Sequence, residues 1–257
     1  MAVTTLDLRV LPGIPLVQPG DNLGEVIASS LQQADMQLQP GDILVIAQKI
    51  ISKAEDCYVF LDEVEVSADA RRWAGKVDKD PALVELILRE SREVVRYRPG
   101  AMIVEHRQGF VHANAGIDRS NIDVHEGRER VLLLPEDANA SARSLQQSLQ
   151  SRLSLSQLGI IVSDSAGRAW REGITGFAIG SAAVPPLVDH VGSRDLFDRE
   201  LEVTTTGDID ELASAASLLM GQGSQGHPVV RVRGWEWQPV DEDASALIRA
   251  PENDLFR

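Results

Sequence analysis

Two segments of the chain group the carboxylate and hydroxyl oxygens that a cation beside a phosphate requires. In the first, the apolar run Leu158–Val162 predicts a buried strand that ends in a polar turn, Ser163-Asp164-Ser165. In the second, residues 114–122, Asp118 lies in a stretch with neither helical nor strand periodicity. Magnesium and manganese bind such oxygen ligands. Two carboxylates from separate loops could share one metal, although Asp, Ser and Asn are also common in plain turns.

Basic residues near these segments could balance the charge of a phosphate. Lys49 and Lys53 lie four positions apart, directly after an apolar run at 43–47. This spacing fits a solvated helix face as well as a phosphate cradle, and the residues leave both interpretations open. Arg168 and Arg171 follow the acidic turn and could also offset phosphate charge.

A glycine-rich segment matches a nucleotide-binding motif only in its letters. Gly221–Gly226 reads G-x-G-x-x-G, but it follows a predicted helix at 208–220 and precedes a predicted strand at 228–232. A dinucleotide fingerprint has the opposite order, strand and then helix, so we reject a Rossmann site. The free carbonyls at a helix C-terminus could instead attract a cation, with Gln222 adding a side-chain oxygen. A plain helix stop is the stronger interpretation from these residues alone.

Other catalytic motifs are absent from the sequence. It contains no P-loop, no H-E-x-x-H and no G-x-S-x-G, and its five histidines have no zinc-ligand spacing. Each histidine is expected to be a surface or hydrogen-bonded residue, and the single cysteine, Cys57, a packed thiol.

The composition restricts the class of partner. The net charge of −14 argues against nucleic acid or an anionic membrane as the main ligand. A single cysteine allows no intrachain disulfide, which fits a reducing compartment. The first residues lack the basic start and apolar core of a signal peptide, and no apolar run is long enough to span a membrane. We therefore expect a cytoplasmic protein.

The elements that must position these residues alternate between strands and helices. We expect a helix from about 22, a hairpin joining 102–104 to 110–112, and a loosely packed acidic tail at 235–257. The other expected strands are 6–10, 43–47, 131–134, 158–162, 177–180, 200–206 and 228–232, and the other expected helices are 67–77, 81–95, 139–153 and 208–220.

Six segments, in order along the chain, together resemble the coenzyme F420-0:L-glutamate ligase family. They are PGIP (Pro12–Pro15), IAQKIISKAE (Ile46–Glu55), LILRES (Leu86–Ser91), ANAGIDRSN (Ala113–Asn121), LLLPED (Leu132–Asp137) and SDSAGRAWREG (Ser163–Gly173). The resemblance covers residues 11–234 and implies a GTP-dependent enzyme that attaches L-glutamate to F420-0 and extends a γ-linked tail. It also implies Mn²⁺ or Mg²⁺, and K⁺ as a further cation.

The resemblance carries site roles onto matching positions of this chain. Ser165 stands where Thr is also common, and Asp56 stands where Gly is frequent, so that turn is expected to differ. The implied metal ligands are Asp118, Asp164, Ser165 and Gln222. The implied GTP contacts are Ile14, Pro15, Leu16, Val17, Gln48, Lys53, Asn121, Met220, Gly221, Gln222, Gly223, Ser224, Gln225, Gly226 and His227. Lys53, Arg168 and Arg171 are the predicted catalytic cations.

The fold implied by the resemblance is α+β, with a mixed, largely antiparallel sheet, flanking helices and two lobes in an intertwined homodimer. Residues 1–234 would form the ligase domain and 235–257 the acidic tail. Two other functions stay open: a metal-dependent phosphohydrolase, which two aspartates and basic residues would also serve, and a non-enzymatic GTP-binding regulator.

Overall fold

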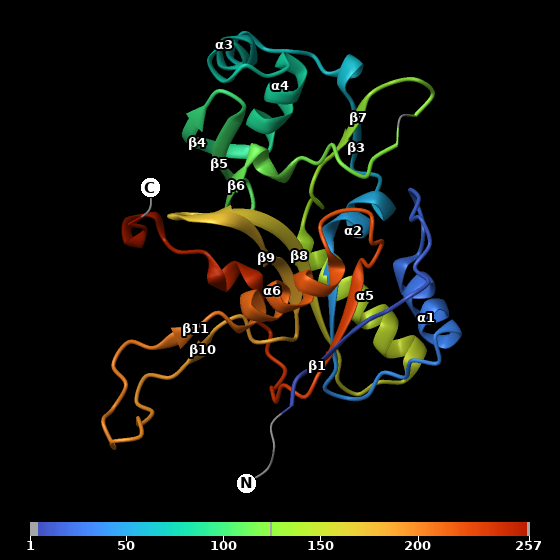
Figure 1. Ribbon diagram of the computed structural model, residues 1–257, viewed down its shortest axis with the longest axis vertical. Helices are drawn as coiled ribbons and strands as arrows, with labels where there is room; N and C mark the ends of the chain where they lie inside the picture. Colours follow the sequence, from blue (N-terminus) through green and yellow to red (C-terminus); the bar gives the residue numbers. More distant parts are fainter. Residues whose placement is uncertain (1–4, 124, 256–257) are drawn as a thin grey trace.

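The computed structural model describes residues 5–123 and 125–255 and is built around a five-stranded sheet (Figure 1). The strand order is β1-β12-β2-β8-β9. The two central strands β2 and β8 run parallel, and every other neighbouring pair in this sheet is antiparallel. The bounds are β1 Asp7–Val10, β2 Ile43–Ala47, β8 Gly159–Arg168, β9 Arg171–Ala182 and β12 Val229–Arg233. The prediction of an α+β fold with a mixed, largely antiparallel sheet is confirmed.

Helices cover both faces of this sheet, which explains why its central strands are apolar throughout. Along β2, Ile43 and Val45 face one hydrophobic core while Leu44 and Ile46 face the other. Successive side chains of a strand point to opposite faces, so a strand covered on both sides has no polar position. Helices α1 (Leu23–Gln33), α2 (Gln48–Ala54) and α5 (Ala138–Leu153) lie on the Leu44 side, and α6 (Asp208–Met220) lies on the other.

A third core lies in the upper part of Figure 1, apart from the main sheet. Helices α3 (Ala68–Val77) and α4 (Pro81–Arg89) pack on the sheet β4-β5-β6. The bounds of these strands are β4 Ser91–Arg98, β5 Ala101–His106 and β6 Val111–Ala113. The strand pair β3 (Tyr58–Phe60) and β7 (Arg130–Leu132) leads between the two parts.

The helix starts predicted near 22, 67 and 81 are confirmed, but one helix is shorter than expected. The side chains of Asn22, Ser67 and Asp80 accept hydrogen bonds from the first turns of α1, α3 and α4. Helix α4 ends at Arg89, so the prediction of a helix to Val95 was wrong. Residues 91–98 instead form β4, because their alternation and adjacent valines suit a strand paired with β5.

Two other predictions about local structure were wrong. Ser163-Asp164-Ser165 is no turn, because β8 continues to Arg168 and forms a long hairpin with β9. Only Thr205–Thr206 of the strand expected at 200–206 is extended as β11, paired with β10 (Val188–Asp189). The chain between β10 and β11 projects from the body as an arm (Figure 1), in which Leu196 and Phe197 are exposed.

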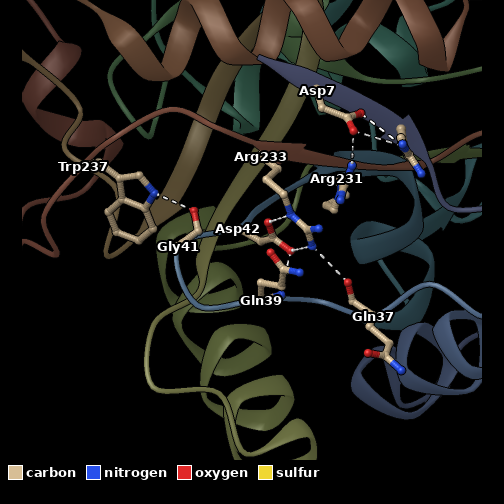
Figure 2. A network of polar contacts seen from close by, with 9 residues as sticks. Asp7, Gln37, Gln39, Gly41, Asp42, Arg231, Arg233 and Trp237 are labelled. Carbon is tan, nitrogen blue, oxygen red and sulfur yellow. Dashed lines mark hydrogen bonds and ion pairs between the residues drawn. The ribbon is translucent and has the colours of Figure 1, made fainter. Parts of the chain in front are cut away.

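The start of the acidic C-terminal segment packs firmly, against the expectation of a loose tail. Trp237 is only 8% exposed, and its Nε1 donates a 2.9 Å hydrogen bond to the carbonyl of Gly41 (Figure 2). Beside it, Arg233 binds both carboxylate oxygens of Asp42 at 2.7 Å (Figure 2). The short helices η3 (Ala244–Leu247) and η4 (Pro251–Asn253) follow, and Ala244 is buried. Within the described residues, no helix is both long and apolar enough to cross a membrane.

Candidate functional site

A polar cavity of about 160 Å³ lies where the two parallel strands end. Ala47, the last residue of β2, is in register with Ser163 of β8, so the chain leaving β2 and the second half of β8 meet at one edge. Carboxyl ends of parallel strands are a common place for ligand sites. The lining residues are Ala47, Gln48, Lys49, Asp118, Ser120, Asn121, Ser163, Asp164, Ser165, Ser217, Met220, Gly221, Gln222 and Gly223.

The main chain fixes Asp118 in this cavity. Its N–H and carbonyl both pair with Leu132, at 2.9 and 3.0 Å, next to strand β7. Upstream, Asn114 and Ala115 adopt left-handed conformations with φ of 51° and 55°, and Gly116 follows with φ of 68°. Non-glycine residues rarely adopt this conformation, and such strain is concentrated at functional sites. The strained turn directs the segment from β6 toward the cavity.

The carboxylate of Asp118 is held by two side chains of α2. Gln48 donates a 2.6 Å hydrogen bond to Oδ2, and Lys49 forms an ion pair with the same oxygen. Ser52 in turn donates to Gln48 Oε1 at 2.9 Å, which fixes the amide. The pKa of Asp118 is raised, mainly by burial. Pairing with Lys49 lowers this pKa, and the nearby charge of Asp164 raises it further. Asp118 and Asp164 thus both line the cavity, and the charge of one carboxylate acts on the other.

Asp164 enters the cavity from the middle of β8. A bulge separates the pairs Val162–Gly180 and Ser163–Ala178, immediately before this residue. Bulges are frequent beside active sites because they redirect the following side chains. His112 of β6 lies against the carboxylate, with Nε2 3.1 Å from Asp164 Oδ2. Burial alone would lower the pKa of His112, but Asp164, the carbonyl of Ala113 and the charge of Asp118 together raise that pKa.

A chain of contacts joins three of the segments predicted to bind GTP. Lys53 Nζ donates a 2.9 Å hydrogen bond to the carbonyl of Asn121, and Asn121 Nδ2 donates to the carbonyl of Gly223 at 3.3 Å. Burial lowers the pKa of Lys53, and the neighbouring charge of Lys49 lowers it further. The sequence left open whether Lys49 and Lys53 form a solvated helix face or a phosphate cradle. A solvated face does not describe them, because Lys49 is paired with Asp118 and Lys53 is hydrogen-bonded to Asn121.

The glycine-rich loop begins at the C-terminus of α6, as its position in the sequence predicted. Met220, Gly221, Gln222 and Gly223 line the cavity, and Gly221 has a φ of 71°. Gln222 Nε2 donates to Ser217 Oγ at 3.1 Å, which leaves its amide oxygen for another partner. The remaining predicted contacts in this loop and the segment Ile14–Val17 do not line the cavity.

Arg168 and Arg171 are not brought together with the other predicted site residues. Both are exposed at the tip of the β8–β9 hairpin, and neither lines the cavity. Arg168 Nη2 donates to the carbonyl of Glu172 at 3.0 Å. Because β8 runs on as a strand, each residue after Asp164 moves the chain about 3.3 Å further from the cavity.

Sequence reasoning did not place His112 or Ser217 in the site. His112 was expected to be a surface or hydrogen-bonded histidine; it is buried, its Nδ1 is hydrogen-bonded to the carbonyl of Ala113, and its Nε2 lies against Asp164. The available signal was its place at the end of a strand leading straight into the segment that holds Asp118. The sequence around Ser217 does not indicate a site residue, because serine is common on the polar face of an amphipathic helix. Its role becomes visible only when the structure shows that this end of α6 borders the cavity.

The donor set suits a hard divalent cation that shares its coordination with a phosphate. Among residues 5–123 and 125–255, no group of three or more His, Cys, Asp or Glu is placed to hold a metal ion. Two carboxylates, four serine hydroxyls and three side-chain amides line the cavity instead. Mg²⁺ sites in phosphate-handling proteins are typically built from one or two carboxylates completed by water and phosphate oxygens. The residues fit this pattern and lack the sulfur and imidazole ligands that zinc prefers.

Comparison with known proteins finds one family of enzymes. The model of the F420-0:gamma-glutamyl ligase family matches residues 13–234. The coenzyme F420:L-glutamate ligase of Methanopyrus kandleri is 44% identical over 257 residues, covering 97% of this chain and 98% of its own. That of Methanothermobacter thermautotrophicus is 43% identical over 254 residues, covering 98% and 99%. That of Methanocaldococcus jannaschii is 38% identical over 246 residues, covering 95% and 94%.

These matches extend over nearly the whole chain. The chain belongs to the F420-0:gamma-glutamyl ligase family. The resemblance seen in the six sequence segments is confirmed.

Proposed function

We propose that this protein is a coenzyme F420:L-glutamate ligase, which forms an amide between the carboxylate of F420-0 and the amino group of L-glutamate. The observation that carries the proposal is the meeting of Asp118 and Asp164 in one cavity, walled by segments expected to bind GTP, in a chain of this family. Formation of an amide from a carboxylate requires activation. In the proposed reaction the carboxylate attacks the γ-phosphorus of GTP, giving an acyl phosphate and GDP. The amine of glutamate then displaces phosphate.

The residues of the cavity suit the first of these steps. Phosphoryl transfer depends on positioning and on neutralising charge more than on a covalent nucleophile. Asp118, Asp164, Ser165 and Gln222 would hold Mn²⁺ or Mg²⁺, which supplies charge neutralisation at phosphate oxygens. Lys49 and Lys53 place two more cations at the same edge. Extension of a γ-linked tail and a supporting K⁺ remain part of the proposal.

We propose different roles for Lys49 and Lys53 in nucleotide binding. Lys49 already neutralises Asp118, so a bound cation would release its ammonium to face the nucleotide. Lys53 holds the carbonyl of Asn121 and so keeps that residue beside the glycine-rich loop. For Arg168 and Arg171 we retain a role in neutralising an anionic part of a substrate that extends beyond the cavity, because both are exposed on the hairpin tip.

We also propose an intertwined homodimer of two-lobed subunits, in which residues 1–234 form the ligase domain and 235–257 a supporting acidic segment. The support is the exposed apolar surface on two projecting elements. In the arm between β10 and β11, Leu196 is 99% and Phe197 80% exposed, and on the β8–β9 hairpin Trp170 is 85% exposed. Exposed apolar groups of this size are typical of interaction surfaces. The double variant Leu196→Asp, Phe197→Asp is compared with wild type by analytical ultracentrifugation. A dimeric wild type and a monomeric variant would support the arm as a dimer contact.

The unpaired state of Cys57, the one cysteine of the chain, agrees with a cytoplasmic location, which we include in the proposal.

One set of omissions tests the function. The protein is incubated with GTP, Mn²⁺, F420-0 and L-glutamate, and then with each component left out, while phosphate and glutamylated product are measured. We expect product, and phosphate in equal amount, only when all four are present. Phosphate release without F420-0 and glutamate would instead indicate a phosphohydrolase. Binding of GTP without either product would indicate a regulator.

A further inference from the structure

The imidazole of His112 is fixed from every side. It is buried, at 8% exposure, on the short strand β6, where His112 pairs with Val104 of β5. Its Nδ1 lies 2.9 Å from the carbonyl of Ala113. A carbonyl oxygen only accepts hydrogen bonds, so Nδ1 carries a hydrogen and donates it. The rings of Phe110 and Phe177 pack on it, with centroids 6.4 and 5.6 Å away.

These contacts leave Nε2 directed at one group. It lies 3.1 Å from Asp164 Oδ2 and, among the described residues, makes no aligned hydrogen bond. A buried polar atom without an aligned partner costs stability, so its retention calls for an explanation. In the part of the chain that the structure describes, no other side chain is paired with the carboxylate of Asp164, whereas Asp118 has both Gln48 and Lys49.

We infer that His112 is a positioning residue, which holds one oxygen of Asp164 so that the carboxylate presents its other oxygen to a divalent cation in the cavity. His112 does not itself line the cavity, so it acts through Asp164 and touches no substrate. Ligating carboxylates are commonly oriented by such outer contacts, whose loss weakens metal affinity about 10- to 100-fold. The inference rests on the metal site within the proposed function, but its main measurement does not require the ligase reaction.

The chain provides a matched control in His106. This residue is fully buried on the adjacent strand β5, stacks on Phe110 at 4.9 Å, and also has a buried Nε2 without a hydrogen bond to a described residue. Its Nε2 lies 3.5 Å from Glu90, and neither residue lines the cavity. A histidine important only for packing should behave as His106 does.

The experiment measures Mn²⁺ binding to the full chain by titration calorimetry, without GTP, for wild type, His112→Leu, His112→Gln and His106→Leu. Glutamine retains a donor near the position of Nε2, so it separates contact with Asp164 from loss of the ring. We expect the Mn²⁺ dissociation constant to rise about 10-fold or more in His112→Leu. It should recover at least in part in His112→Gln and stay near wild type in His106→Leu.

Three results would overturn the inference: unchanged Mn²⁺ affinity in His112→Leu, no recovery in His112→Gln, or an equal loss in His106→Leu. If His112→Leu does not fold, the comparison of His112→Gln with His112→Asn decides, because asparagine is too short to reach Asp164. Equal affinities in that pair would contradict the role. A wild type that binds Mn²⁺ but forms no glutamylated product would defeat the proposed function while leaving the effect of His112 on metal affinity measurable.

Discussion

Lys53 and Asn121 lie 68 positions apart, and the ammonium of Lys53 donates a 2.9 Å hydrogen bond to the main-chain carbonyl of Asn121. Asn121 in turn contacts the carbonyl of Gly223, a further 102 positions along the chain. One lysine therefore connects the end of helix α2 to two loops that border the cavity. Removal of the Lys53 side chain should weaken nucleotide binding for two reasons. The site loses a positive charge, and the segment of Asn121 loses the hydrogen bond that holds it.

Lys53→Ala should weaken GTP binding while the fold persists. Loss of a hydrogen bond from a charged group is typically worth about 1.5–3 kcal/mol, so the dissociation constant should rise at least about 10-fold. Titration calorimetry with GTP measures this, and circular dichroism checks the fold. Lys76→Ala, on the remote helix α3, is the control and should bind as wild type does. Unchanged GTP affinity in Lys53→Ala would show that Lys53 supports the Asn121 segment without contributing to nucleotide binding.

Trp237 should be essential for stability although it lies in the segment expected to be loose. Trp237→Ala removes a side chain that is 8% exposed and should lower the free energy of unfolding by about 3–5 kcal/mol. Leu255→Ala is the control, because this apolar side chain of the same C-terminal segment is 89% exposed and its loss should cost at most about 0.5 kcal/mol. Urea denaturation followed by circular dichroism measures both. Equal effects of the two substitutions would show that the acidic segment does not pack on the core.

The ion pair of Arg233 and Asp42 should contribute more than the surface pair beside it. Asp42 is 1% exposed, so Arg233→Ala leaves a buried carboxylate without its cation and should cost about 3 kcal/mol. Arg9, which pairs with Asp7 at the surface, is 65% exposed, and Arg9→Ala should cost at most about 1 kcal/mol. The difference between the two free energies of unfolding is the test, and similar losses would contradict the role of burial.

Cys57 should be inert toward alkylation near neutral pH. Burial raises the pKa of its thiol to about 11, and the charges of Glu55 and Asp56 act in the same direction. The thiolate is the reactive form, and at pH 8 only about one molecule in a thousand would carry it. The rate of reaction with iodoacetamide should therefore rise steadily from pH 8 to pH 10, by about 10-fold per unit. The unfolded protein should instead react with the ordinary profile of a free cysteine, levelling off above about pH 8.5. A native profile that levels off there would contradict the raised pKa.

Much of the fold follows from local sequence signals. The start of α1 followed from the helical spacing of its apolar residues and that of α4 from Asp80 and Pro81, and the apolar run at 43–47 matched strand β2. These signals depend on a few neighbouring residues, whose capping and alternation act locally. The continuation of β8 beyond Val162 depends instead on pairing with β9, which supplies a partner for each polar residue. No local pattern reveals such pairing, so the acidic turn was predicted where a strand exists.

The same distinction applies to the site. Asp118 and Asp164 were singled out because carboxylates in polar stretches after apolar segments suit a metal, and the structure places both on one cavity. The position of His112 before the Asp118 segment was visible in the sequence, but its contact with Asp164 depends on how β6 lies against β8. The two arginines failed to join the cavity for the converse reason. The two arginines are close to Asp164 in the sequence, but the extended strand β8 carries the chain away from the cavity before it reaches them.

The central claim is that Asp118 and Asp164 share a divalent cation that glutamyl transfer requires. The most direct test is Mn²⁺-dependent glutamylation of F420-0 by wild type, Asp118→Asn, Asp164→Asn and the double variant, with the exposed Asp69→Asn as control. Each single substitution should nearly abolish turnover, since loss of metal-held charge costs several kcal/mol and about 1.4 kcal/mol is already tenfold in rate.

The double variant should be scarcely slower than either single one, because residues acting as one unit are not additive. Mn²⁺ should raise the melting temperature of wild type and Asp69→Asn, but not of the three site variants. Wild-type turnover together with Mn²⁺-dependent stabilisation in either Asp118→Asn or Asp164→Asn would contradict the shared site.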